Sequence, residues 1–449
     1  MKTTKNLLYK VKLTFLLAIF LTATVNIFAQ KKEDYKVTKQ EKRQVIDSIA
    51  QFMTDMYVFP DKGKEMGELV NSNFKNGKYD DTENPEEFAN QLTEDLRSVN
   101  NDRHIGVGYA PERIAMMQKA EADENNKELE ELEKLRMEHM NYSFKEVKIL
   151  PGNVGYLKFN GFVDAAYAGA TAIAAMNFLA NTGALIIDLT DNGGGSPSLI
   201  QLITSYFFED TEHLNSFYIR EGDQTQQFWT LPYVPGKKLT ETELYILTSQ
   251  FTFSGAEEFT YNLKNMERAT VVGETTGGGA HPVNSHIIND NFTIRIPFGK
   301  AVNPITNSNW EGTGIEPDVK TSKDEAYDKA YSLALKSLKD KETNEQIKQT
   351  LEWAFMGQDT KVNPFKLETR DMKKYVGQYG PRNISLEDGE LYYQREERPK
   401  MKLIPMKEDY FMFNEIDYFR LRFIFENGKA VAVEGTYDNG RTDRNERTK

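Results

Sequence analysis

The run ALIIDLTDNGGGSPS, residues 184–198, opens with a continuous apolar segment, which is typical of a strand that is buried on both faces. An alternating stretch at residues 154–159 reads as an earlier strand, and an Ala-rich helix that Asp164 caps lies between the two. Strand, helix and buried strand in this order form a β-α-β unit, whose crossover should be right-handed. The sequence therefore predicts an α/β core.

Three glycines at residues 193–195 follow the buried strand. They allow the backbone to turn with positive φ and bring N–H groups close to a ligand. Ser196 and Pro197 then begin another helix. By itself this pattern fits a phosphate loop or a plain turn equally, and the Gly-Lys-Ser/Thr of nucleotide loops is absent.

The run YILTSQFTFSGAEEF, residues 245–259, also passes from an apolar strand through a turn into a helix. A serine at such a turn, here Ser254, is held away from the core, near the unpaired N–H groups at the positive end of the helix dipole. This environment suits a nucleophile whose attack creates an oxyanion. The structural alternative is that Thr252 and Ser254 are only N-caps, a usual role of hydroxyl residues.

The composition excludes several classes of function. A net charge of -12 argues against a nucleic-acid partner, because phosphate binding needs a basic face. The lack of cysteine removes disulfides, thiolate catalysis and Cys-based metal sites. None of the five histidines forms a closely spaced pair with an acidic neighbour, as in a zinc helix. We therefore predict no metal and no cofactor.

Residues 1–29 have the layout of a secretory signal, with a basic start, an apolar run at 13–28 and a small residue at Ala29. The apolar run is short for a stable membrane span, which needs about 20 residues, so a retained anchor is the weaker alternative. An exported chain without disulfides fits a bacterial periplasm or cell surface. No stable membrane span is expected after signal removal.

The 449 residues suggest two to four domains. Changes in composition and in hydrophobic periodicity divide the chain into six segments. These are the signal peptide 1–29, N-terminal helical bundle 30–110, charged helical connector 111–145, α/β core 146–325, helical connector 326–363, and antiparallel β domain 364–449. The bundle ends in NNDRHIGV, residues 100–107, where His104 lies between a polar turn and an apparent strand. A lone histidine is more often structural than catalytic.

Four blocks in order, at residues 185–195, 248–257, 272–282 and 312–319, resemble the signatures of the C-terminal processing (tail-specific) serine peptidases. The resemblance covers roughly residues 40–335 and implies a core of the Clp-protease/crotonase type. It puts Ser254 in the place of the nucleophile.

One departure indicates the branch of this family. The bacterial processing branch uses a lysine base after the nucleophile, but no Lys lies between Asn265 and Phe298. The other branch resembles the tricorn core protease and the repeats of interphotoreceptor retinoid-binding protein. It carries a His after an Asp before the core, which His104 matches, and a Glu before the last block, which Glu311 matches. Residues 111–142 are too short and too charged for a PDZ insert, which also fits this branch.

The resemblance implies a serine peptidase that acts on peptides or unfolded proteins. Ser254 would attack, His104 would remove its proton, and Glu311 would support the imidazole. The oxyanion would be held by N–H groups of Gly194 or Gly195 together with Gly255. His281 would line the site or cap the loop next to Pro282, and the general usage of histidine favours the structural role.

Two other interpretations stay open. The retinoid-binding relatives suggest a catalytically weak or inactive protein that binds an apolar ligand or a protein partner. The other interpretation is a surface interaction protein that binds its partner through the C-terminal β domain. Only the composition supports it. The sequence leaves the oligomeric state and the cleavage specificity open.

Overall fold

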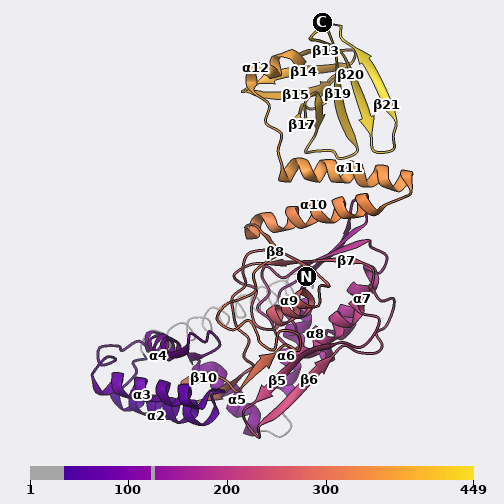
Figure 1. Ribbon diagram of the computed structural model, residues 1–449. Coiled ribbons are helices and arrows are strands. Elements are labelled where there is room, and N and C mark those ends of the chain that lie inside the picture. Colours follow the sequence, from indigo (N-terminus) through magenta and orange to yellow (C-terminus); the bar gives the residue numbers. More distant parts are fainter. Residues whose placement is uncertain (1–34, 123–126, 449) are drawn as a thin grey trace, which may run out of the picture. The chain divides into compact units, whose positions relative to one another are not determined.

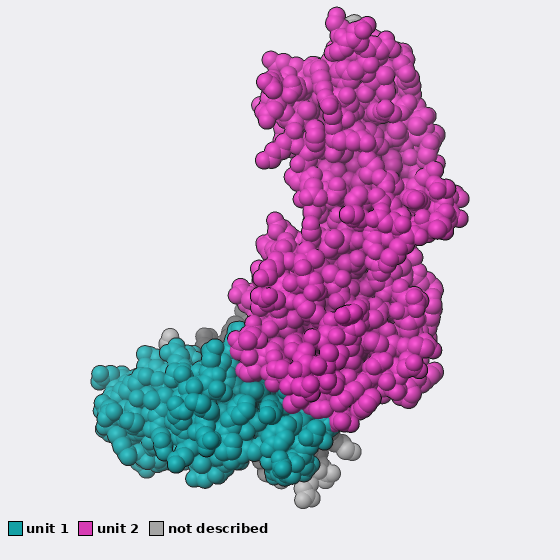
Figure 2. Space-filling model, in the orientation of Figure 1, with its two compact units in different colours: residues 1–130, 217–226, 281–301 teal, residues 131–216, 227–280, 302–449 magenta. Residues whose placement is uncertain are grey.

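The computed structural model describes residues 35–122 and 127–448, so the predicted signal segment lies outside the described residues. Two compact units divide the chain (Figure 2). The first comprises residues up to 130 together with 217–226 and 281–301, and the second comprises 131–216, 227–280 and 302–449. In the described part of the chain, no helix has both the length and the apolar character that crossing a membrane requires.

Three helices open the first unit: α2 (Lys39–Met56), α3 (Pro60–Lys75) and α4 (Pro85–Asn100). Asn84 caps α4 by accepting hydrogen bonds from the amides of Glu86 and Glu87, and Pro85 occupies the first helical position, as the sequence predicted. The apolar stripes of the three helices face one another and form a common core.

A three-stranded antiparallel sheet completes this core, in the order β1 (Gly106–Tyr109), β10 (Phe292–Pro297), β9 (Val283–Ile287). Phe88 of α4 packs edge-on against Phe292 of β10. The charged segment after β1 is helical, as its charge spacing indicated, and contains α5 (Pro111–Ala122) and α6 (Lys127–His139).

The second unit contains a six-stranded sheet, of which Figure 1 labels β7 and β8. Its order is β12 (Val319–Lys320), β8 (Thr270–Gly273), β7 (Glu243–Thr248), β4 (Ala184–Asp188), β3 (Val154–Phe159), β2 (Phe144–Leu150). All neighbours are parallel except the edge pair β2 and β3. The helix α7 (Ala165–Phe178) connects β3 to β4, and Asp164 caps it, which confirms the predicted β-α-β unit.

Both faces of this sheet are buried, which explains the continuous apolar runs of its strands. Leu185 and Ile187 of β4 pack with α7, α8 (Pro197–Thr204) and α9 (Gly255–Asn265). Ala184 and Ile186, which alternate with them, pack with α10 (Lys323–Lys341) and α11 (Glu345–Val362) on the other face. Because β4, β7 and β8 are parallel, the loops that follow them leave the same edge of the sheet.

The remaining strands form three antiparallel or mixed sheets. One has the order β11 (Gly299–Val302), β5 (His213–Ile219), β6 (Gln224–Trp229). After α11 and the short α12 (Thr369–Met372), the chain is antiparallel β structure with a core of its own, rich in Tyr and Phe. Its two sheets comprise β13 (Gly377–Tyr379), β14 (Arg382–Glu387), β15 (Glu390–Arg395) and β16 (Met401–Lys402); and β17 (Ile404–Lys407), β18 (Tyr410–Met412), β19 (Phe419–Glu426), β20 (Lys429–Tyr437) and β21 (Thr442–Glu446).

Candidate active site

Ser254 lies in the second unit at the turn between β7 and α9, directly before the first residue of the helix. Its backbone has φ 53° and ψ -121°, a region that non-glycine residues rarely occupy and that costs about 1–3 kcal/mol. The surrounding structure holds this strained conformation: the amide of Phe253 donates to the carbonyl of Asn192 at 3.1 Å, and the amide of Glu258 donates to the carbonyl of Ser254 at 2.9 Å. A rigid, strained serine at a strand-to-helix turn is typical of nucleophiles.

Glu257 fixes this turn from within. Its buried carboxylate accepts a hydrogen bond from the amide of Ser254 at 2.8 Å. It also accepts from the hydroxyl of Thr276 at 2.5 Å and from the amides of Gly278 at 2.7 Å and Gly279 at 2.8 Å. Burial raises the pKa of Glu257, and these donors offset part of the rise. Glu257 therefore ties the turn of Ser254 to the loop that follows β8. Sequence analysis assigned Glu257 no role, although this residue belongs to the block at residues 248–257.

The glycine loop after β4 lies against Ser254. A Cβ on Gly194 would come within 2.9 Å of the Ser254 Cβ and 2.5 Å of the Gly255 nitrogen. Gly194 has φ 96°, so glycine is needed there for conformation as well as for space. The Gly194 amide donates to Asn192 Oδ1 at 2.9 Å. Among the described residues no acceptor is found for the amides of Gly195 and Gly255, which leaves these two N–H groups beside Ser254 for a ligand.

Glu311 lies in the same unit as Ser254, on the segment before β12. One carboxylate oxygen, Oε2, accepts from the Ala280 amide at 2.6 Å, and its own amide donates to Asn309 Oδ1 at 3.0 Å. The neighbouring Trp310 is buried and donates from Nε1 to the carbonyl of Gly279 at 2.8 Å. The loop that Glu257 holds therefore also holds Glu311.

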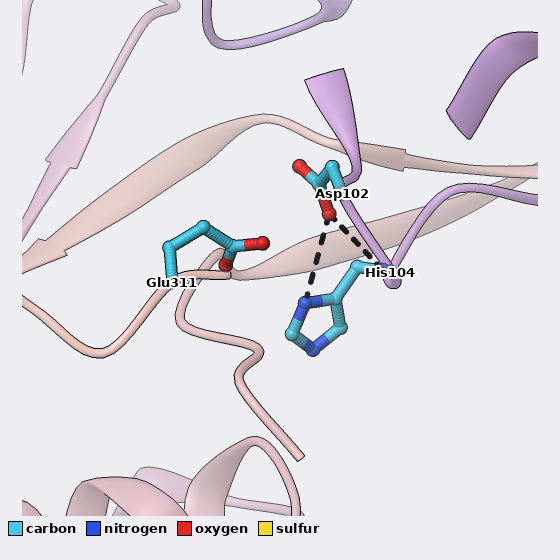
Figure 3. Close-up of side chains that lie close together, drawn as sticks. All are labelled: Asp102, His104 and Glu311. Atoms are coloured by element: carbon cyan, nitrogen blue, oxygen red, sulfur yellow. Dashed lines mark hydrogen bonds and ion pairs between the residues drawn. The ribbon is translucent and has the colours of Figure 1, made fainter. Parts of the chain in front are cut away.

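His104 lies in the first unit, in the turn between α4 and β1, and only 3% of it is exposed. Figure 3 shows its ring beside Asp102, with His104 Nδ1 4.0 Å from Asp102 Oδ1. The His104 amide donates to the same carboxylate oxygen at 3.0 Å, so Asp102 fixes the backbone of the turn. Figure 3 also labels Glu311, which belongs to the second unit.

Burial lowers the pKa of His104 to about 4; the Asp102 carboxylate opposes this shift, whereas His281, Arg295 and Arg97 add to it. The imidazole is therefore neutral at neutral pH. A neutral ring is the form that accepts a proton, as a general base must.

Asp102 is fully buried and is the centre of a hydrogen-bond network. Its Oδ2 accepts from the Tyr57 hydroxyl at 3.0 Å and lies 2.7 Å from His281 Nδ1, and Asn100 Nδ2 donates to the Tyr57 hydroxyl at 2.7 Å. Burial alone would raise the pKa of Asp102, but the hydrogen bond and charge of His281, with His104, lower it. Sequence analysis predicted His281 as a site-lining or loop-capping residue. In the structure it binds the carboxylate of Asp102, which holds the turn of His104.

The predicted site residues are therefore distributed over both units. Ser254, Gly194, Gly195 and Gly255 lie together in the second unit, which also contains Glu311, whereas His104 and His281 lie in the first. An α/β fold that presents a strained serine beside two unengaged amides is typical of serine hydrolases.

Comparison with known proteins gives the family. Residues 153–321 match the model of peptidase family S41, and residues 36–151 match the model of the N-terminal domain of S41 peptidases in eukaryotic IRBP. The protein belongs to peptidase family S41 and is a serine-type peptidase.

Several solved structures are similar to the chain. A candidate peptidase from Parabacteroides merdae has 19% identity and a TM-score of 0.47, over 66% of this chain and 96% of that one. The photosystem II D1 C-terminal processing protease has 14% identity and a TM-score of 0.40, over 64% and 94% of the two chains. The tricorn protease has 12% identity and a TM-score of 0.43, over 66% and 37%.

Proposed function

We propose that the protein is an exported serine peptidase that cleaves peptides or unfolded proteins through an acyl-enzyme, with Ser254 as nucleophile, His104 as general base and Glu311 as the acid that supports the imidazole. The observation that carries this proposal is the strained turn of Ser254, with the amides of Gly195 and Gly255 beside it. We also propose that the core is of the Clp-protease/crotonase type, and that residues 1–29 direct export.

In the proposed reaction His104 takes the proton of the Ser254 hydroxyl while Oγ attacks the carbonyl carbon of the scissile bond. The negative charge that develops on the carbonyl oxygen is stabilised by two amides. Gly195 and Gly255 fit this role better than Gly194, because the Gly194 N–H is engaged by Asn192. Each such donor is worth about 3 kcal/mol. His104 gives its proton to the leaving amine, and water then hydrolyses the ester by the same steps, which releases a carboxylate and restores the Ser254 hydroxyl.

Consecutive residues make the hydrogen bonds that hold the proposed acid and the turn of the proposed base. Ala280 donates its amide to Glu311, and the next residue, His281, binds the carboxylate of Asp102. One peptide bond therefore connects the residue that holds Glu311 to the residue that holds the Asp102–His104 turn.

The test is labelling with a fluorophosphonate, which reacts with activated serines, and location of the adduct by mass spectrometry. We expect the adduct on Ser254, no labelling in Ser254→Ala, and labelling slowed by about a thousandfold or more in His104→Gln, since triad members contribute factors of this size. Glu311→Gln should slow labelling less. The control variants are Ser285→Ala and Glu316→Gln, both at exposed positions.

Equal labelling of wild type and His104→Gln would overturn His104 as the base. An adduct on another serine would overturn Ser254 as the nucleophile. Circular dichroism of each variant confirms that a loss of labelling is not a loss of fold. Labelled and unlabelled enzyme are then each incubated with an unfolded protein. Comparison of the cleavage products shows whether hydrolysis depends on the same serine.

A further inference from the structure

The second unit contains a cavity that is separate from Ser254, the glycine loop and Glu311. Its volume is about 560 Å³, within the range of about 300–1,000 Å³ that is usual for small-molecule sites. The turn between β2 and β3, the helices α10 and α11, and the start of β19 form its walls, and Figure 1 shows α10 and α11 side by side. Four aromatic side chains belong to the lining, namely Tyr327, Tyr331, Trp353 and Phe419.

Arg420 is the buried charged residue among those that line this cavity. It lines the cavity although only 3% of the residue is exposed, and its guanidinium carbon stacks 3.8 Å from the ring centre of Trp353. Nη2 donates to the carbonyl of Trp353, whereas Nη1 has no hydrogen-bond partner among the described residues. On the helix side, a Cβ on Gly357 would lie 3.1 Å from Nη2, so glycine leaves room for the guanidinium.

The charge of Arg420 is incompletely balanced. Burial lowers the pKa of Arg420, and the charge and hydrogen bond of Tyr410, together with the charges of Glu352 and Asp417, offset part of this effect. A buried cation with an unused N–H group is costly unless an anion pairs with it. The arrangement therefore favours an acidic ligand.

We propose that this cavity binds a small ligand that has one carboxylate and an apolar body. The planar guanidinium suits a carboxylate, and the aromatic walls suit an aliphatic or aromatic body. Lys361, Asp417 and Asp438 also line the cavity, at exposed positions, and the two aspartates disfavour a doubly charged group such as a phosphate. A peptide with a free C-terminus and a fatty acid share this chemistry. The proposal goes beyond the peptidase activity and does not depend on it.

The test uses the full chain with Ser254→Ala, so that no probe is hydrolysed, and isothermal titration calorimetry. One pair of probes is N-acetyl-trileucine as the free acid and as the amide; the other is decanoate and decanamide. We expect at least one acid to bind, and its amide to bind about tenfold or more weakly, because the charged hydrogen bond is lost. The pair that binds identifies the source of the carboxylate.

Two variants test the role of Arg420. Arg420→Leu should abolish binding of the acid while the thermal midpoint stays equal or rises, since an apolar side chain replaces a buried charge. Arg420→Lys keeps the charge but loses the planar fork, so it should bind about tenfold more weakly and serves if the Leu variant does not fold. The control is Arg398→Leu, at an exposed position between β15 and β16. Equal binding of acid and amide, no binding of any probe, or unchanged binding by Arg420→Lys would each overturn the proposal.

Discussion

The backbone of Ser254 stores strain that should be measurable. Two variants without the hydroxyl, Ser254→Gly and Ser254→Ala, differ only in whether a Cβ must occupy φ 53° and ψ -121°. Because glycine takes this conformation without steric cost, we expect Ser254→Gly to be about 1–3 kcal/mol more stable than Ser254→Ala. Urea unfolding gives both free energies. Equal stabilities would show that the turn relaxes and that the nucleophile is not strained.

Asp102 and His281 should be strongly coupled, because both are buried and their side chains lie 2.7 Å apart. In a double-mutant cycle of Asp102→Asn and His281→Gln, we expect each change alone to be destabilising and the pair to be less so than the sum, with a coupling of about 1–3 kcal/mol. Additive effects would contradict a direct interaction. His139→Gln, at an exposed position, is the matched control.

At this scale the sequence indicated some of these residues and missed others. Ser254 and the glycine loop were recognisable because strand, turn and helix are local patterns, and their catalytic roles stay predictions. Asp102 was visible in the sequence as the first residue of an Asp-x-His pattern, but sequence analysis assigned it no role. The partner of Asp102, His281, lies 179 residues further along the chain, and no local pattern reports such a contact.

Among the helices, α9 carries a buried acid that the proposed reaction does not use. Burial raises the pKa of Glu258 from its ordinary value of 4.5 to about 7, and the nearby Asn215 offsets only part of this rise. Between these values the unfolded chain has released a proton that the native state keeps, so Glu258 makes the protein less stable as pH rises from 4.5 to 7.

Glu258→Gln should remove this pH dependence. Relative to wild type, its free energy of unfolding should increase by about 3 kcal/mol between pH 4.5 and pH 8. Chemical unfolding across this range measures the difference, with the exposed Glu267→Gln as control. A difference that stays constant with pH would show that Glu258 is charged in the native state at pH 7.

Elements that depend on residues close together in the sequence were predictable. Pairings between strands that are far apart in the sequence were not. The caps of α4 and α7 and the unit of β3, α7 and β4 depend on neighbouring residues, and the sequence predicted them. The pairing of β1 with β10 joins residues 106–109 to 292–295, and β5, β6 and β11 form a sheet that the sequence did not indicate. Register across such distances depends on the folded core, not on local propensity.

For the chain as a whole, the apolar cores predict where it can be shortened. The C-terminal β structure has its own core, whereas α10 and α11 cover one face of the six-stranded sheet. We expect a chain that ends at Asn363 to stay soluble and to keep fluorophosphonate labelling of Ser254. A chain that ends at Ser322 lacks α10 and α11, exposes that face and should aggregate. Gel filtration and labelling of both chains test this; loss of labelling in the longer one would assign the β structure a part in activity.

The distance along the chain between Asp102 and His281 also sets an order of events during synthesis. The ribosome makes Asp102, which begins the turn of His104, 179 residues before its partner His281, and Glu311 follows later still. A nascent chain that already contains Ser254 therefore still lacks His281 and Glu311, which are proposed to help prepare Ser254 for attack. If the triad is as proposed, the growing polypeptide stays inert towards itself and its neighbours until the last part of the site has been translated.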